Sequence, residues 1–153
     1  MLTLTSRAFE NGGFIPARYT ADGANTNPPL TISGVPKNAV SLVLIIDDPD
    51  AATDPDGPGK TFDHWVLFNI PPSYINILEN SVPKGAVVGL NSIGTNSYIG
   101  PAPPNGVHKY RFKLFALDTR LDRPPQTTKE ELEQAMAGHI IDQSELTSKY
   151  RRA

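Results

Sequence analysis

The chain has 153 residues, of which 20% are charged, with a formal net charge of -2 and no cysteine. The near-balance of charge gives no general attraction to nucleic acid or to an anionic membrane surface, so neither partner is expected. The lack of cysteine excludes disulfides, thiol catalysis and cysteine-ligated metal centres. The length predicts one domain over residues 1–153, large enough to bury a core.

The apolar runs of the sequence are short. The first residues, MLTLTSRAF, lack a basic start followed by an apolar stretch, so we predict no signal peptide. No apolar run approaches the ~20 residues that cross a bilayer. A cytoplasmic location without a membrane span is therefore expected. With 15 prolines and 12 glycines, the composition favours a loop-rich β protein over a helical bundle.

Apolar patterning predicts a series of strands. Residues 40–46 form a continuous branched apolar run, which indicates a strand buried on both faces. Residues 109–117 alternate between apolar and polar side chains, which indicates a strand with one buried face. Residues 91–106 are rich in Gly, Pro and Asn and predict a long functional loop. The strands are expected at residues 2–9, 14–20, 30–33, 40–46, 62–70, 85–90 and 109–117.

One short helix is predicted near the C-terminus. Thr128 and Glu131 have the spacing of a capping box, in which each side chain meets the other residue's backbone N–H. Gly138 is a natural stop. Because a helix stop precedes residues 139–150, we expect that segment to be a strand rather than a second helix. The apolar face of the helix is supplied by Leu132, Ala135 and Met136.

The stretch DDPDAATDPDGP, residues 47–58, holds five carboxylates and is the first candidate for chemistry. Aligning Gly57 with the glycine of a calcium-binding EF-hand loop puts Ala52 at the first ligand position, so that motif is rejected. Most of these acids are interpreted as solvated turn residues: Asp50, Asp54 and Asp56. Asp48 differs, because a carboxylate at the end of a buried strand needs donors or a cation.

The three histidines fall in different settings. His64 lies inside an apolar strand, where an isolated histidine usually bonds backbone in the core. His108 stands where the irregular loop becomes a strand, a place that often carries function. His139 follows the helix stop, and we interpret it as structural. Ser97 lies in GTNSYIG, which is not a nucleophile elbow, and the sequence holds neither a phosphate-binding P-loop nor an H-E-x-x-H motif.

Several short motifs follow one another in a specific order. They are DPDA at 48–51, HW at 64–65, NIP at 69–71, Y-x-G-P-x-P-P-x-G-x-H-x-Y-x-F at 98–112 and L-F-A-L-D at 114–118. Together they resemble the phosphatidylethanolamine-binding protein family, also called Raf-kinase-inhibitor-like proteins, in its bacterial and archaeal branch. The resemblance runs over residues 6–151. It implies a mainly β fold, with a large antiparallel sheet packed on a smaller one by Greek-key connections.

The resemblance also implies one surface pocket for a small anion. Asp48 would orient a histidine and raise its pKa, and the protonated imidazole and backbone N–H groups would hold the anion. With two histidines and one shared acid, binding would be stronger in mild acid. Ala102 stands where the family often has Gly or Cys. The pocket residues carried over are Asp48, Ala51, Phe62, His64, Ile99, Gly100, Pro101, Ala102, Pro104, His108 and Tyr110.

Two functions remain open from the residues. The favoured one is a non-enzymatic, regulatory or inhibitor-type module that binds a phosphorylated or carboxylated group, such as a phosphorylated head group. The alternative is a hydrolase of phosphoesters, in which Asp48, His64 and His108 hold a metal or a histidine acts as general base. The favoured function implies no cofactor and no metal. A kinase or protease target and a homodimer are further expectations.

Overall fold

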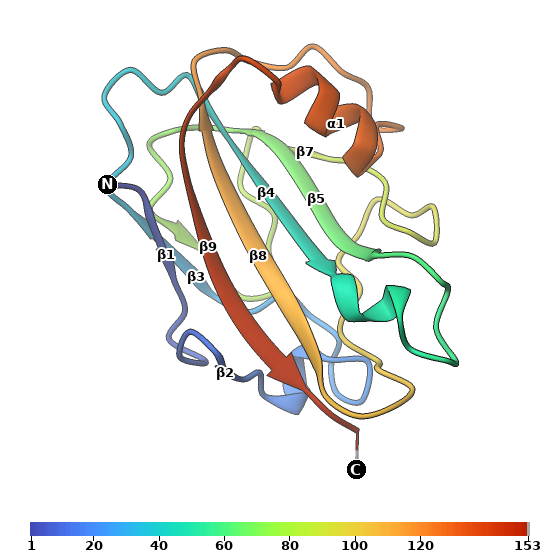
Figure 1. The fold of residues 1–153 in the computed structure, drawn as a ribbon. Helices are drawn as coiled ribbons and strands as arrows, with labels where there is room; N and C mark the ends of the chain where they lie inside the picture. Colours follow the sequence, from blue (N-terminus) through green and yellow to red (C-terminus); the bar gives the residue numbers. More distant parts are fainter. Residues whose placement is uncertain (153) are drawn as a thin grey trace.

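The computed structural model describes residues 1–152, and it is mainly β, with two sheets and one α-helix near the C-terminus (Figure 1). The large sheet has the strand order β2-β9-β8-β4-β5-β7, and the small sheet has the order β1-β3-β6. The element bounds are β1 Thr3–Thr5, β2 Gly13–Phe14, η1 Ala17–Tyr19, β3 Leu30–Ser33, β4 Ser41–Asp48, η2 Pro49–Ala52, β5 Phe62–Ile70, β6 Asn76–Ile77, β7 Val87–Val88, β8 His108–Leu117, α1 Lys129–Met136 and β9 Ile140–Tyr150.

The large sheet contains the expected Greek key. Strands β4, β5 and β7 are neighbours, and β8 returns to pair with the far side of β4, which gives the order β8-β4-β5-β7. These pairings are antiparallel, as is β8 with β9, whereas β2 joins β9 in parallel. The C-terminal end of β4 therefore lies beside the N-terminal ends of β5 and β8.

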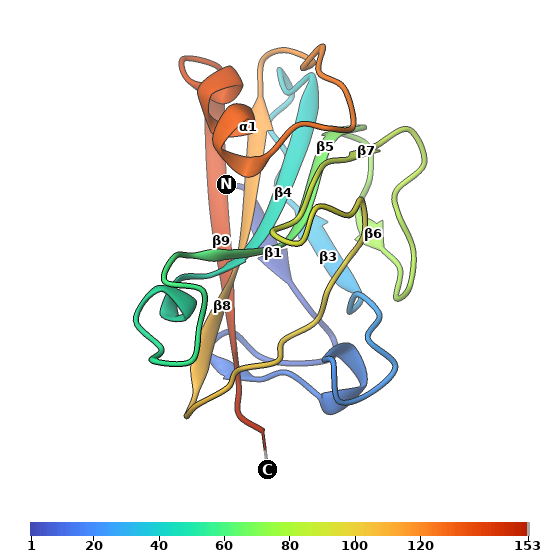
Figure 2. The same ribbon diagram turned by 90° about the vertical axis from the view of Figure 1, so that its right-hand side faces the viewer.

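The main core lies between the two sheets, which face each other (Figure 2). The small sheet contributes Leu4 and Ile32, and the large sheet contributes Leu44 and Phe112. The predicted alternation along β8 is confirmed, because Tyr110, Phe112, Leu114 and Ala116 point into this core. Lys109 is exposed, and Phe115 packs on the opposite face of the sheet. As predicted, β4 is buried along its whole length.

A second core lies on the outer face of the large sheet, where α1 covers β4 and β5 (Figure 1). The predicted capping box is present: the Thr128 hydroxyl accepts from the Glu131 amide, and the Glu131 carboxylate accepts from the Thr128 amide. Gly138 has φ +82°, a conformation that suits glycine, and the chain then enters β9 as predicted. The buried residues of this core are Val43, Ile45, Val66, Phe68, Leu117, Leu121, Leu132 and Met136.

A buried charge cluster fixes which way the end of β4 faces. Asp47 points to the outer face, where Arg111 Nε lies 2.8 Å from its Oδ1. Lys129 of α1 reaches the same carboxylate at 3.4 Å and Asp63 at 2.9 Å. Because successive strand residues point to opposite faces, the cluster directs the next residue, Asp48, to the other side of the sheet.

Two strands predicted near the N-terminus are shorter than expected. The segment 2–9 is a strand only at Thr3–Thr5, because the Ser6 hydroxyl folds the chain by donating to Pro29 O and accepting from the Ala8 amide. The segment 14–20 leaves the strand after Phe14 and turns into a 3-10 helix, preceded by Pro16 with φ −59°. Proline lacks the N–H that would continue a ladder, so a strand ends there.

Candidate functional site

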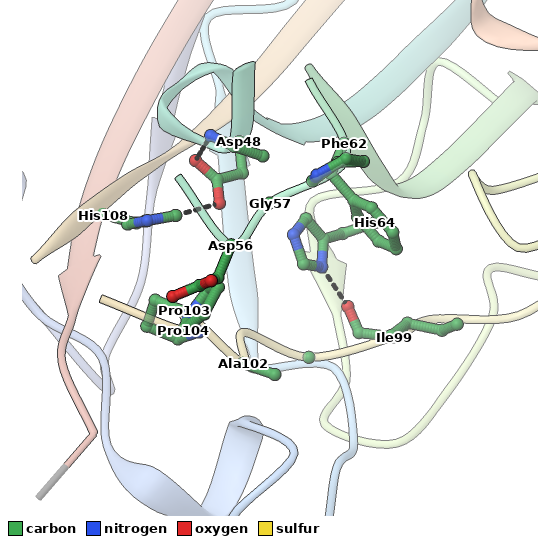
Figure 3. A pocket seen from close by; sticks show the side chains of 13 residues that line it. Asp48, Asp56, Gly57, Phe62, His64, Ile99, Ala102, Pro103, Pro104 and His108 are labelled. Carbon is green, nitrogen blue, oxygen red and sulfur yellow. Dashed lines mark hydrogen bonds and ion pairs between the residues drawn. The ribbon is translucent and has the colours of Figure 1, made fainter. Parts of the chain in front are cut away.

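A pocket opens at the edge of the large sheet where β4 ends and β5 and β8 begin (Figure 3). The loop 53–61 closes one side, and the loop 99–107 closes the other. The cavity has a volume of about 190 Å³ and mostly apolar walls. Its lining residues are Asp48, Ala51, Asp56, Gly57, Pro58, Phe62, His64, Ile99, Gly100, Ala102, Pro103, Pro104 and His108.

The structure brings together most of the residues predicted for the pocket. Of the eleven, only Pro101 and Tyr110 do not line the cavity. Pro101 is buried in the loop, where its carbonyl accepts from the Ala21 amide at 3.0 Å. Tyr110 lies behind the site, with its ring centroid 5.3 Å from that of His64 and 6.4 Å from that of His108. The lining residues that the sequence prediction missed are Asp56, Gly57, Pro58 and Pro103.

The DPDA motif places its first acid at the pocket through a helix cap. Asp48 is the N-cap of η2, and its Oδ1 accepts from the amides of Asp50 at 2.9 Å and Ala51 at 3.3 Å. Pro49 occupies the first helical position, where its missing N–H costs nothing. Oδ1 thus accepts from two backbone amides, while Oδ2 stays available to accept from a side chain of the pocket. Burial raises the pKa of the Asp48 carboxyl above its ordinary value.

His108 is held between two carboxylates. Its Nδ1 lies 2.6 Å from Asp48 Oδ2, and its Nε2 lies 2.7 Å from Asp54 Oδ2. The imidazole is 4% exposed, and burial opposes its charge, but the two carboxylates outweigh burial and raise the pKa of His108. The protonated ring donates from both nitrogens. His108 therefore has no N–H left to offer a ligand.

The interpretation as a solvated turn residue was wrong for Asp54, whose side chain is 2% exposed, whereas Asp56 does lie exposed in a turn. The side-chain amide of Asn105 donates to Asp54 Oδ1 at 2.8 Å and to Asp56 Oδ2 at 2.7 Å. Asp50 Oδ2 accepts from the backbone N–H of Lys109 at 2.7 Å. The Asn105 amide, with further hydrogen bonds, lowers the pKa of Asp54 to about 2. Asp54 and Asp56 thus connect the loop 53–61 to the loop 99–107, and Asp50 connects η2 to the start of β8. Their partners lie about fifty residues away, so no local pattern announces them.

A β-bulge delivers His64 to the pocket. Along the β4–β5 pair, Ile46 is opposite Trp65 and Asp47 is opposite Asp63, so His64 is the extra residue on β5. Asp63 points outward to the charge cluster, and Trp65 points into the main core. Bulges re-aim side chains beside functional sites. Here the bulge frees His64 from the strict alternation of a regular strand.

The His64 ring is fixed by one carbonyl. Its Nδ1 lies 2.6 Å from Ile99 O, and a carbonyl only accepts, so Nδ1 carries the hydrogen. Its Nε2 is buried and has no partner among residues 1–152. Figure 3 shows this ring turned toward the space between Asp48 and the apolar wall of Ile99. Burial lowers the pKa of His64 to about 4, so in the neutral ring Nε2 is a free acceptor.

The expectation of two histidines sharing one acid was wrong. Within residues 1–152, His64 forms no hydrogen bond or ion pair with a carboxylate, whereas His108 pairs with two. The metal-site hypothesis fares no better, because His108 uses both nitrogens on carboxylates and residues 1–152 contain no group of three His, Asp or Glu side chains placed to hold a metal. Ser97 does not line the pocket, and its hydroxyl pairs with that of Thr95.

Residues 5–151 match the family model described as phosphatidylethanolamine-binding protein. The chain belongs to the phosphatidylethanolamine-binding protein family. A UPF0098 protein of Methanothermobacter thermautotrophicus is 48% identical over 156 residues, which cover 99% of both chains. The resemblance inferred from the motifs is thereby confirmed.

Solved structures place the fold in the same family. A phosphatidylethanolamine-binding protein homologue from Chlamydia trachomatis is 41% identical, with a TM-score of 0.91 over 99% of this chain and 98% of that chain. The E. coli protein YbcL, described as a member of the mammalian family, is 27% identical, with a TM-score of 0.88 over 99% of both. None of the helices formed by residues 1–152 is long and apolar enough to cross a membrane.

Proposed function

We propose that this chain is a non-enzymatic binding protein whose pocket holds a small oxyanion, such as a phosphate or carboxylate group on a small molecule or a partner protein. Membership of the phosphatidylethanolamine-binding protein family supports a binding role. The observation that carries the proposal is the Nε2 atom of His64, which is buried at the cavity and has no hydrogen-bond partner in the described part of the chain.

Buried polar atoms normally have hydrogen-bond partners, so an unpaired Nε2 points to a group that is supplied from outside. Phe62 packs against the His64 ring with centroids 4.7 Å apart, and Ile99 covers another side. Walls of low polarity strengthen a polar bond formed between them. A ligand oxygen that shares a proton with Nε2 would complete the site.

The charges around the pocket determine how an anion can enter. Asp48 and Asp54 carry two negative charges, and the imidazolium of His108 between them carries one positive charge. A ligand that brings a further bare negative charge meets repulsion. A proton shared between the ligand and His64 lowers the added negative charge by one unit and so reduces that cost. Binding of an oxyanion is therefore coupled to the presence of one proton.

This coupling sets the pH dependence of affinity. A phosphate monoester loses its second proton near pH 6. Above that pH the free ligand and His64 both lack the required proton, so binding takes one up, and affinity falls about tenfold per pH unit. Below it, and above the His64 pKa of about 4, affinity stays level. Stronger binding in mild acid is thus expected through His64 and its ligand, with Asp48 acting on His108.

Calorimetric titration with inorganic phosphate and O-phosphorylethanolamine at pH 6 tests the proposal. We expect saturable binding by the wild type that is lost in His64→Ala. His139→Ala is the matched control, because that ring is 47% exposed and, among the described residues, forms a hydrogen bond with Asp118 alone. Unchanged affinity in His64→Ala, or no binding by the wild type, would contradict the proposal.

The broader roles implied by the resemblance belong to the same proposal. Recognition of a phosphorylated head group, inhibition of a kinase or protease target, a homodimer and a cytoplasmic location each require their own test. Hydrolysis of p-nitrophenyl phosphate by the purified protein, lost in both His64→Ala and His108→Ala, would instead establish an enzyme.

A further inference from the structure

We propose that the pocket selects oxyanions that carry a proton on the oxygen facing His64, such as the monoanion of a phosphate monoester. It would reject oxyanions of the same shape and charge that carry no proton, such as a sulfate monoester. This inference rests on the proposed function and specifies the chemical class of ligand for the same site. It follows from counting the donors and acceptors that the walls still offer.

The two imidazoles offer no free donor to a ligand. The Nδ1–H of His64 is spent on the carbonyl of Ile99 at 2.6 Å, which leaves a lone pair at Nε2. Both ring nitrogens of His108 face carboxylates at 2.6 and 2.7 Å. An oxygen that reaches Nε2 without a proton therefore meets lone pair against lone pair. An oxygen that carries a proton donates to it.

The wall amides outside the strands are mostly spent as well. The Gly100 amide donates to Asn25 Oδ1 at 2.7 Å, and the Gly57 amide donates to Asp54 O at 2.9 Å. Prolines at 58, 103 and 104 have no amide hydrogen. Within residues 1–152, Ala102 is the lining residue outside the strands with an amide hydrogen that forms no hydrogen bond. That amide suits the ionised oxygen of a monoanion, which needs one donor.

The remaining polar atoms on the walls are acceptors. The carboxylates of Asp48 and Asp56 line the pocket, so a ligand's second bare oxygen has nowhere favourable to go. Protonation of His64 itself could rescue such a ligand, but burial of the ring opposes its charge. The titratable groups that face this ring or lie close to it are Asp47 and Asp48 of β4, Asp54 and Asp56 of the loop, and His108 and Tyr110 of β8.

Methyl phosphate and methyl sulfate form a matched pair for the test. At pH 5 both are monoanions of similar shape, and they differ by one P–OH proton, because a phosphate ester keeps this proton up to about pH 6. Calorimetry should show methyl sulfate binding about 10- to 100-fold more weakly than methyl phosphate. Equal affinities would overturn this inference while leaving the oxyanion pocket standing. Binding of neither probe would defeat the proposed function and the inference together.

His64→Gln gives a second, opposite test. A glutamine amide can turn either its oxygen or its NH₂ toward the ligand, so the variant should bind the two probes within about threefold of each other. Retained discrimination in a folded variant would overturn the inference. Proton uptake by the wild type needs no variant. At pH 7.5, titrations with methyl phosphate in two buffers of different ionisation enthalpy should show about one proton bound per ligand, and none would overturn the inference.

Discussion

The Nδ1 atom of His108 lies 2.6 Å from Oδ2 of Asp48, although sixty residues separate them in the chain. This contact joins the start of β8 to the end of β4. The opposite nitrogen of the same ring holds Asp54 of the loop 53–61, so one imidazole fastens three segments around the pocket. The cavity is therefore formed before any ligand arrives, which reduces the ordering cost of binding.

His108 should remain protonated to a higher pH than an ordinary histidine. Burial opposes the charge, but Asp48 and Asp54 raise the pKa of His108 in the folded state. The protonated His108 therefore stabilises the folded state. This contribution to the free energy of unfolding is complete below the pKa of His108 in the unfolded chain and is lost as pH rises through its raised value in the folded state. NMR titration of the ring should show the raised pKa, and a smaller rise in Asp54→Asn. If His108 had the same pKa in the wild type and in Asp54→Asn, the proposed pairing of His108 with Asp54 would be contradicted.

Asn105→Ala should loosen the loop 53–61. The variant removes the amide that bonds both Asp54 and Asp56, and two close carboxylates then repel each other. Hydrogen exchange across residues 53–57 should accelerate several-fold, and phosphate affinity should fall. Asn38→Ala is the control, because Asn38 is exposed and forms no side-chain bond within residues 1–152. Equal exchange in the two variants would show that Asn105 does not hold the loop.

Tyr110→Phe should stabilise the protein. The Tyr110 hydroxyl is buried without a partner among residues 1–152, so its removal relieves an unsatisfied donor and raises the free energy of unfolding by about 1 kcal/mol. Tyr98→Phe is the matched opposite, because the Tyr98 hydroxyl donates to Tyr19 O at 2.6 Å, and its loss should cost about 1 kcal/mol. Urea unfolding measures both. Destabilisation by Tyr110→Phe would show that its hydroxyl has a partner.

Lys129→Met should destabilise the fold without altering the pocket. Lys129 is buried and bridges Asp63 at 2.9 Å and Asp47 at 3.4 Å. Its removal leaves the Asp63 carboxylate uncompensated, whereas Asp47 keeps Arg111 and Lys113. The cost should be about 3 kcal/mol, the low end for such a loss, because Arg111 still pairs with Asp47. Urea unfolding beside the exposed control Lys84→Met measures it. A loss no larger than that of the control would show that the cluster contributes little.

The sequence predicts the elements whose signals are local. The apolar run before Asp48, the alternation from Lys109 and the capping box at Thr128 each depend on neighbouring residues, and each appears in the structure as expected. The early strand from Phe14 failed because Pro16 redirects the backbone, a local effect that apolar alternation obscures. The family resemblance named most of the residues that line the pocket.

The hydrogen-bond and ion-pair partners of the pocket side chains could not be predicted from the sequence. The Asp54 carboxylate meets His108 and Asn105, and both contacts depend on how two distant loops face each other. The role of His64 depends on one extra residue in the β4–β5 register and on the carbonyl of Ile99. Register and loop packing are properties of the whole fold, so the sequence predicted one acid shared by two histidines, whereas Asp48 pairs with His108 and His64 bonds the carbonyl of Ile99.

The most direct test of the central claim is the ¹⁵N NMR signal of His64 Nε2 while inorganic phosphate is added at pH 6.5. The account predicts a saturable shift of this signal from an unbonded lone pair to a nitrogen that shares a proton with the ligand. The His139 ring should not respond. Saturable phosphate binding measured by calorimetry in the same sample, with no change at His64 Nε2, would contradict the account.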